Sequence, residues 1–157
     1  MGARIHVVLK HNGTNLEPTE LDDQAQKDIA DREKRIRDSG DSEQIKKLDK
    51  ALAASQLEHK NVPRHRMIVL SQELKDEIIW QVTDASGKPK TGFTVQMKAI
   101  NGGENNPFSN KELDDKNTGK VVSGDPVDGI PGNRYHYEVK MKEQPRAAYD
   151  PDCYISD

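Results

Sequence analysis

Cysteine is almost absent from the chain, because Cys153 is the only one among 157 residues. A single cysteine excludes an internal disulfide bond and suits a reducing compartment. No apolar run approaches the roughly 20 residues that a membrane-spanning helix needs. The segment from Met1 to Lys10 has no charged start followed by an apolar stretch of signal-peptide length. We therefore expect a cytoplasmic protein with no membrane partner, unless a leader has been removed.

Apolar and aromatic residues are also scarce. Hydrophobic residues make up 32% of the chain and aromatic residues 4%, which is little more than the core of one domain requires. Charged residues make up 32% with both signs interspersed, and the net charge is −3. The basic run Lys60, Arg64, His65 and Arg66 is too short to neutralise many phosphates. The composition predicts one domain over residues 1–157 without a nucleic-acid partner.

The familiar catalytic and metal-binding motifs are missing as well. The chain has no Gly-x-Ser-x-Gly elbow, no phosphate-cradling glycine loop and no His-Glu-x-x-His motif. Its histidines form no i, i+4 pair on a helix and have no cysteine partner at zinc spacing. They are His6, His11, His59, His65 and His136. We predict no catalytic residue, no cofactor and no metal site, so an enzyme is not expected.

Two chemical alternatives rank below that prediction. Cys153, His136 and Met141 are ligand types of a blue-copper site, but cupredoxins place such ligands in one short loop, and here Cys153 lies in the predicted last strand. Acidic neighbours also disfavour a nucleophilic thiolate at this position. Asp114 and Asp115 offer oxygen ligands for Ca²⁺, yet no EF-hand spacing accompanies them. A structural role is the simpler interpretation of each group.

The N-terminal third combines a strand with a helical segment. Over Ala3–Lys10 the apolar residues alternate, which predicts a strand that ends at the Asn12-Gly13 turn. Residues 17–60 then show helical spacing, with Gly40 suited to a left-handed helix end. Thr19 is a candidate cap for the first helix, and Asp41 or Ser42 for the second. This pattern predicts an antiparallel helical hairpin inserted in a β-domain.

Opposite charges on the first predicted helix stand four residues apart in the favourable order. Asp28 precedes Arg32 in this way, and Glu33 precedes Arg37. Each such pair stabilises a helix by only about 0.2–0.5 kcal/mol. Because the apolar stripes are narrow, we expect the hairpin to need support, from the β-domain or from a partner.

The remainder of the chain predicts strands. Apolar residues alternate with polar ones between clusters of Gly, Pro, Asn and Asp. The predicted strands are Met67–Leu70, Glu77–Thr83, Phe93–Ile100, Gly119–Ser123, Arg134–Lys142 and Cys153–Ser156. The long polar loop 101–117 is expected to be held by Phe108, and Trp80 to be the centre of the core. With the N-terminal strand this gives about seven strands, the count of an antiparallel immunoglobulin-like or cupredoxin-like sandwich.

Short aromatic and proline motifs follow one another in the C-terminal half. They are Trp80, Phe93-x-Val95, Asn106-Pro107-Phe108, Tyr135-x-Tyr137-x-Val139 and Asp150-Pro151-Asp152. This order resembles a family of small bacterial cupredoxin-like or immunoglobulin-like domains, many of them without an assigned activity. The resemblance implies a sandwich that has no bound metal and no catalytic residue to carry over. It does not include the helical segment.

These observations together favour a non-catalytic protein-binding, adaptor or regulatory module. The recognition elements are expected to be the helical hairpin and the sandwich loops. The side chains predicted to contact a protein partner are Leu21, Ile29, Ile36, Ile45, Leu48, Leu52 and Phe108. Two alternatives remain open: a small-molecule or metal-dependent protein, including a redox protein built around Cys153, and an inhibitor or immunity protein for a toxin or protease.

Overall fold

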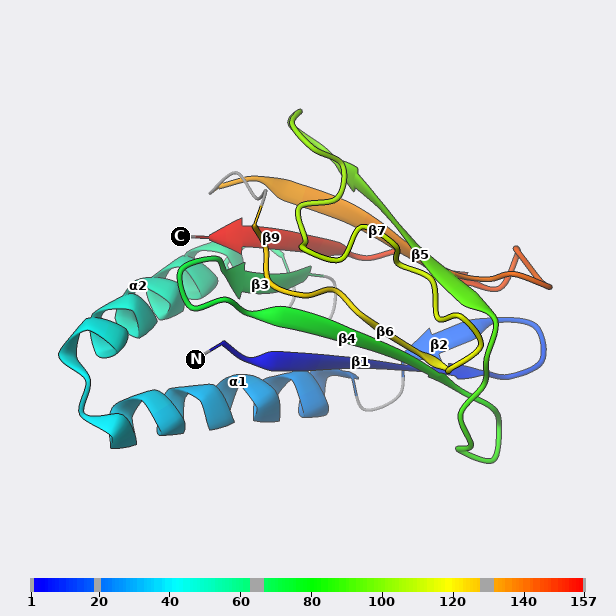
Figure 1. The fold of residues 1–157 in the computed structure, drawn as a ribbon, viewed down its shortest axis with the longest axis horizontal. Helices are drawn as coiled ribbons and strands as arrows, with labels where there is room; N and C mark the ends of the chain where they lie inside the picture. Colours follow the sequence, from blue (N-terminus) through cyan, green and yellow to red (C-terminus); the bar gives the residue numbers. More distant parts are fainter. Residues whose placement is uncertain (1, 19–20, 63–66, 128–131, 157) are drawn as a thin grey trace.

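A computed structural model describes residues 2–18, 21–62, 67–127 and 132–156, and of residues 21–23 only the backbone. Within these ranges, two β-sheets form the body of the protein and two helices lie along one side of it (Figure 1). The first sheet has the spatial order β2 (Leu16–Pro18), β1 (Arg4–His11), β4 (Glu77–Thr83) and β6 (Lys120–Val122). The second has the order β3 (Met67–Ser71), β9 (Asp152–Ser156), β7 (Arg134–Met141) and β5 (Phe93–Ala99), and β8 (Ala148–Tyr149) pairs with β7.

The predicted alternation of apolar residues is confirmed in the long strands. In β1 every second residue from Ile5 to His11 is buried, and in β7 every second residue from Tyr135 to Met141. Strand β3 differs, because all five of its residues are buried. A strand buried on both faces carries a continuous apolar run, which the sequence of β3 shows.

Trp80 occupies the centre of the core, as predicted. Its side chain is fully buried on β4 and meets Tyr137 of β7 edge to face, with ring centroids 5.5 Å apart. Phe108 approaches Trp80 from the loop with a centroid distance of 6.3 Å. Such edge-to-face pairs add about 0.5–1.5 kcal/mol to the burial of the rings. The aromatic cluster therefore joins the two sheets and the loop.

The prediction of a wholly antiparallel immunoglobulin-like sandwich is wrong. Strands β1 and β4 run parallel, and so do β3 and β9. What the structure shows is a β-rich mixed α/β fold of two mixed sheets and two helices. Alternation in one strand is set by which face is buried, and it carries no information on the direction of the neighbouring strand. The seven predicted strands are present within a residue or two, and the short strands β2 and β8 were not predicted.

The two helices are α1 (Leu21–Ser39) and α2 (Ser42–Glu58). Between them Gly40 has φ +69°, and the Asp41 carboxylate accepts hydrogen bonds from the backbone N–H groups of Glu43 and Gln44. The helix end and the second cap are thereby confirmed, whereas Thr19 lies outside the described residues. Neither of these helices combines the length and the apolar character that crossing a membrane would require.

Candidate functional site

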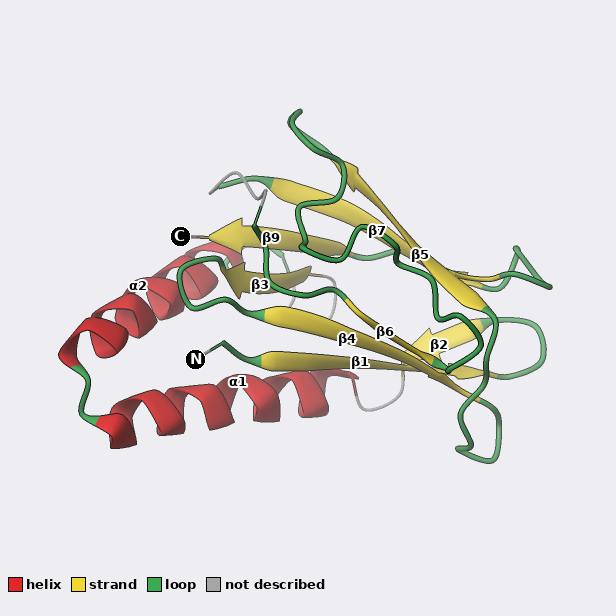
Figure 2. Cartoon of the chain, viewed as in Figure 1, coloured by secondary structure: helices red, strands yellow, loops and turns green. Residues whose placement is uncertain are grey.

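The helices diverge from their turn, so that the hairpin forms a V whose open end faces the sheets (Figure 2). Near the turn the V is closed by a separate apolar cluster that contains Ile36 of α1, Leu48 and Ala51 of α2 and Leu74 of the β3–β4 turn. Toward the open end, Ala25 and Ile29 of α1 pack instead against the main core between the sheets. The hairpin was expected to need support from the β-domain or from a partner, and these two clusters show that the β-domain provides support.

A cleft of about 220 Å³ lies between α1, α2 and β3. We call it the helix cleft and define it by its apolar lining, formed by Ala25, Ile29, Ala30, Leu52, Met67, Ile68 and Val69. Polar side chains complete its lining, among them Glu33 of α1, Gln56 of α2 and His59, which directly follows α2. The volume is below the roughly 300–1,000 Å³ of typical small-molecule sites. It suits a few side chains better than a cofactor.

A buried ion pair fixes α1 relative to both sheets. Asp76 follows the β3–β4 turn and is fully buried, and Arg32 of α1 donates to its carboxylate. The same carboxylate accepts the backbone N–H groups of Ala3 and Ser71, each at 2.8 Å. Asp76 thus joins the start of β1, the end of β3 and the helix in one hydrogen-bonded group, which sets one wall of the cleft.

A second polar contact holds α1 along β1. The Asp28 carboxylate accepts the backbone N–H of His6 at 2.8 Å and lies 3.1 Å from His6 Nδ1. The predicted helical pair between Asp28 and Arg32 is therefore not formed, because each side chain turns to the sheets. The exposed pair Glu33–Arg37 is present at 3.2 Å. Spacing along a helix identified these charges, but only the packed sheets determined which partner each one has.

The predicted partner-binding residues fall into two groups. Ile29 and Leu52 are half-buried and both line the helix cleft, one from each helix. Ile36, Leu48 and Phe108 are fully buried inside the chain, and Ile45 packs against the cluster at the turn. The side chain of Leu21 lies outside the described residues. The contribution that β3 makes to the cleft was not predicted, although its uninterrupted apolar run, Met67 to Leu70, was the available signal.

The second part of the loop 101–117, from Asn106 on, lies along one side of the sheet pair, whereas residues 101–105 are exposed. Asn110 donates through Nδ2 to the Val122 carbonyl at 2.8 Å, beside the edge of β6. On the other sheet, Val95 of β5 donates its backbone N–H to the Leu113 carbonyl at 2.8 Å. With Phe108 buried as its anchor, this loop covers two sheet edges. Its predicted role in recognition stays a prediction.

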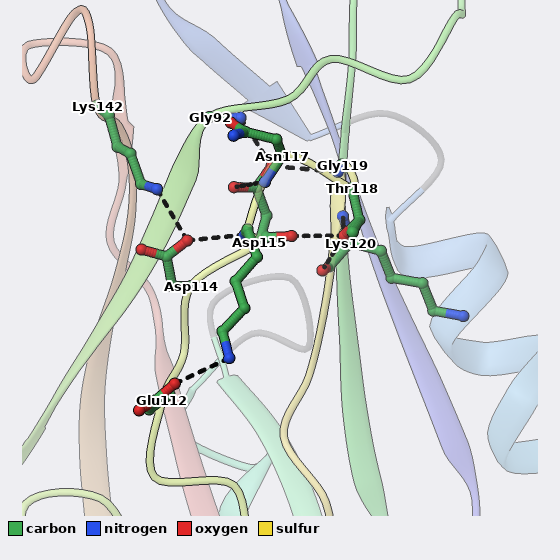
Figure 3. Close-up of polar contacts among 10 residues, drawn as sticks. Gly92, Glu112, Asp114, Asp115, Asn117, Thr118, Gly119, Lys120 and Lys142 are labelled. Atoms are coloured by element: carbon green, nitrogen blue, oxygen red, sulfur yellow. Dashed lines mark hydrogen bonds and ion pairs between the residues drawn. The ribbon is translucent and has the colours of Figure 1, made fainter.

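Asp115 locks the end of that loop (Figure 3). Its buried carboxylate accepts backbone N–H groups from Gly92 at 2.7 Å, Gly119 at 3.1 Å and Asn117 at 3.2 Å. The neighbouring carboxylate of Asp114 points outward to Lys142 at 2.8 Å, and this lowers the pKa of Asp114. Asp115 is therefore occupied as a structural acceptor, which is the simpler of the two interpretations given above.

Cys153 lies in β9 and is fully buried. Burial, with a smaller effect of Asp152, raises the pKa of its thiol far above the ordinary value. A thiol held protonated and inaccessible is a poor nucleophile and a poor metal ligand. His136 of β7 lies on the surface of the same sheet, where its ring contacts Asp152 at 2.9 Å and Asp150 at 3.9 Å.

Over the described ranges, no group of three or more His, Cys, Asp or Glu side chains is arranged to hold a metal ion. His65 and its neighbours Arg64 and Arg66 fall outside those ranges. Comparison of the chain with protein-family models, curated proteins and solved structures finds no match.

Proposed function

We propose that the protein is a non-catalytic protein-binding module whose binding site is the helix cleft. The observation that carries the proposal is that two half-buried apolar side chains, Ile29 of α1 and Leu52 of α2, line the same cleft beside β3. Apolar positions that remain partly accessible between two helices are a common docking arrangement for a partner segment. The small volume favours side chains of a partner over a separate small ligand.

Other hollows on the described surface support this proposal less well. One of about 330 Å³ is lined by residues of which most are polar, including His11, Lys90 and Gln144. Another of about 410 Å³ is an open depression beside Gln96 and Lys111. Neither combines apolar walls from two helices with a strand at its floor. The buried Cys153 thiol likewise offers no support for the redox alternative.

We also propose a relationship to small β-sandwich domains, without the antiparallel strand order that was expected from the sequence. The core contact between Trp80 and Tyr137 and the Asp-Pro-Asp segment before the last strand support kinship with small cupredoxin-like or immunoglobulin-like domains. The parallel pairs depart from the antiparallel scheme, and the hairpin at 17–60 is an addition to it. In this proposal the β-domain serves as the rigid support of the hairpin.

The test compares two alanines of the hairpin. Ala30 is exposed and lines the helix cleft, whereas Ala53 is exposed on α2 and does not line it. Ala30→Arg fills the cleft with a long charged side chain without removing any buried group, and Ala53→Arg makes the same chemical change elsewhere. Tagged forms of both variants and of the natural chain are used for affinity capture from the source cells. Each captured protein is then purified and titrated against all three chains by calorimetry.

The proposal expects direct binding to the natural chain and to Ala53→Arg, with a loss of about tenfold or more for Ala30→Arg. Equal unfolding midpoints of the two variants show that the loss is not due to unfolding. Equal affinities of all three chains would refute the cleft as the binding site. An adaptor and an inhibitor differ in the next measurement, which is the activity of the purified partner with and without this protein.

A further inference from the structure

The dipeptide Asn-Gly occurs twice in the chain, at Asn12-Gly13 and at Asn101-Gly102. Asparagine is a thermolabile residue, because its side-chain amide can be lost without an enzyme. A glycine in the next position favours this loss, since glycine has no Cβ to hinder the approach of its own nitrogen to the asparagine side chain. The chain therefore has two candidate positions for the same covalent change, and the structure allows their surroundings to be compared.

The two positions are alike in exposure and in backbone shape. All four residues are exposed. Each glycine has a positive φ, +100° at Gly13 and +89° at Gly102, and a Cβ added to either one would meet no other part of the chain within 4 Å. Accessibility and crowding therefore do not distinguish Asn12 from Asn101.

The side chain of Asn12 is held by the turn that it forms. Its Oδ1 accepts the backbone N–H groups of Thr14 at 3.0 Å and Asn15 at 2.8 Å, and also the Thr14 hydroxyl at 3.1 Å. Its Nδ2 donates to the Glu17 carboxylate at 2.9 Å. An asparagine side chain that bonds the backbone ahead of it in this way stabilises a turn. Its amide must break several hydrogen bonds before the Gly13 nitrogen can reach it.

The side chain of Asn101 has no comparable restraint. Among the described residues, neither its amide nor the N–H of Gly102 has a hydrogen-bond partner. The chain is tied on both sides of these groups, because the Ile100 N–H donates to the Arg134 carbonyl at 3.0 Å and Asn133 Nδ2 donates to the Gly102 carbonyl at 3.0 Å. Both ties leave the two reactive groups free. The segment that contains them projects from the end of β5 (Figure 1).

We propose that Asn101 is a site of spontaneous deamidation and that its turn protects Asn12 from the same reaction. In the first step the Gly102 nitrogen attacks Cγ of Asn101 and forms an N–Cγ bond, while the Cγ–Nδ2 bond breaks. The proton of the attacking N–H leaves with Nδ2 as ammonia, and a cyclic imide remains. Water then adds to either carbonyl of the imide and opens the ring, which gives aspartate or isoaspartate. The reaction consumes only water.

Both products change this end of the second sheet. Each adds a negative charge to the exposed segment 101–105. Isoaspartate also lengthens the main chain by a methylene group between Ile100 and Gly102, which are tied to Arg134 and Asn133. The longer path does not fit the same two hydrogen bonds. Formation of isoaspartate should therefore loosen the connection between the end of β5 and the start of β7.

The first experiment uses the natural chain. The folded protein is incubated at mildly alkaline pH in water labelled with heavy oxygen, and timed samples are digested in ordinary water and analysed by peptide mass spectrometry. Ring opening during the incubation places heavy oxygen in the new carboxylate, which separates it from deamidation during digestion. Because Asn12 must first break several hydrogen bonds, we expect Asn101 to lose its amide about tenfold or more faster than Asn12. Equal rates, or a faster loss at Asn12, would overturn the inference.

Unfolding the same chain is the matched control. In concentrated guanidinium chloride the turn at Asn12 is lost and both dipeptides are equally accessible. Asn12 should then react at least as fast as Asn101. A preference for Asn101 that persists unchanged in the unfolded chain would place its cause in the neighbouring sequence, and the protective role of the turn would be refuted.

A pair of variants tests the chemical step. Glutamine keeps an amide but would have to close a larger ring, so Asn101→Gln should abolish the fast phase of ammonia release from the folded chain. The matched change Asn12→Gln should leave that phase in place. Isoaspartate should accompany aspartate at position 101, because water opens the imide at either carbonyl. Aspartate alone would indicate direct hydrolysis of the side chain and would refute the attack by Gly102.

Hydrogen exchange tests the structural consequence. The Ile100 amide should exchange faster in chains that carry isoaspartate at position 101 than in fresh protein, because its hydrogen bond to Arg134 is strained by the longer main chain. The Asn15 amide, which is bound to the Asn12 side chain, should be unchanged. Equal exchange of Ile100 in aged and fresh protein would refute the loosening of β5 from β7.

Discussion

Removing the charge of Asp76 should destabilise the protein more than the same Asp→Asn or Glu→Gln change at any other acidic residue in or beside the hairpin. In Asp76→Asn, the buried Arg32 guanidinium loses its counter-ion, and the new amide places a donor against one of three existing donors. Breaking a buried ion pair by removing one partner costs about 3–5 kcal/mol. Against a total stability of about 5–15 kcal/mol for a typical domain, that is a large share. At about 2–4 °C per kcal/mol for a chain of this size, the melting temperature falls by about 6–20 °C.

The assay uses the single tryptophan of the chain. Trp80 is fully buried, so its fluorescence reports unfolding in urea without a label. Asp38→Asn is the control, because Asp38 forms an exposed ion pair with Lys34 on α1, the helix that carries Arg32. The control should leave the urea midpoint unchanged within error. A change for Asp76→Asn no larger than that of Asp38→Asn would refute the assignment of Asp76 as the junction between α1 and the sheets.

A double variant separates the charge from the hydrogen bonds. Replacing buried ion pairs by apolar residues is often neutral or stabilising by about 1–4 kcal/mol. Arg32 Nε is buried without a partner among the described residues, so the pair is not ideally satisfied. Arg32→Met in the Asp76→Asn background should therefore recover stability. If it instead lowers stability further, the loss in Asp76→Asn comes from packing and not from an uncompensated cation.

Three further predictions concern the loop, the thiol and the hairpin. Asp115→Asn should lower the unfolding free energy by about 2–4 kcal/mol, because buried backbone donors lose a charged acceptor, while Asp114→Asn should cause no comparable loss in the same urea titration. Burial raises the pKa of the Cys153 thiol above its ordinary value of 9.0, so the folded chain keeps a proton that the unfolded chain releases. The free energy of unfolding should then decrease as the pH rises above 9.0, by up to about 1.4 kcal/mol per pH unit. This decrease should be missing in Cys153→Ala. Equal slopes of unfolding free energy against alkaline pH in the two chains would contradict the prediction. Deletion of residues 18–60 should abolish cooperative unfolding by calorimetry, because it exposes the buried strand β3 and leaves Asp76 without Arg32; a sharp transition in the shortened chain would show that the hairpin is not structural.

Strand positions and helix ends were largely available from the sequence. The alternation in Ile5, Val7 and Leu9 depends on which face of one strand is buried, and Gly40 with Asp41 records a helix end followed by a cap. Such signals are local, so they survive without knowledge of the rest of the fold. The burial of Trp80 and the anchoring role of Phe108 followed from the same reasoning, because large aromatic side chains in a soluble chain with few of them are needed for the core.

The candidate site depended on contacts that no local pattern records. An apolar residue at helical spacing is expected to be buried, but the spacing does not show whether the chain itself or a partner buries it. Because the two helices diverge, the residues predicted to contact a partner differ in their surroundings. Ile36 and Leu48 are covered by the chain itself, whereas Ile29 and Leu52 border a cleft.

The amino-acid order by itself determined where strands and helices form, since these depend on neighbouring residues a few positions apart. The direction of strand pairing, the partners of Arg32 and Asp28 and the burial of β3 beside the helices were decided only when distant segments packed together. Asp76 lies 44 positions from Arg32, and the energy of that contact exists only where folding has removed water from both groups.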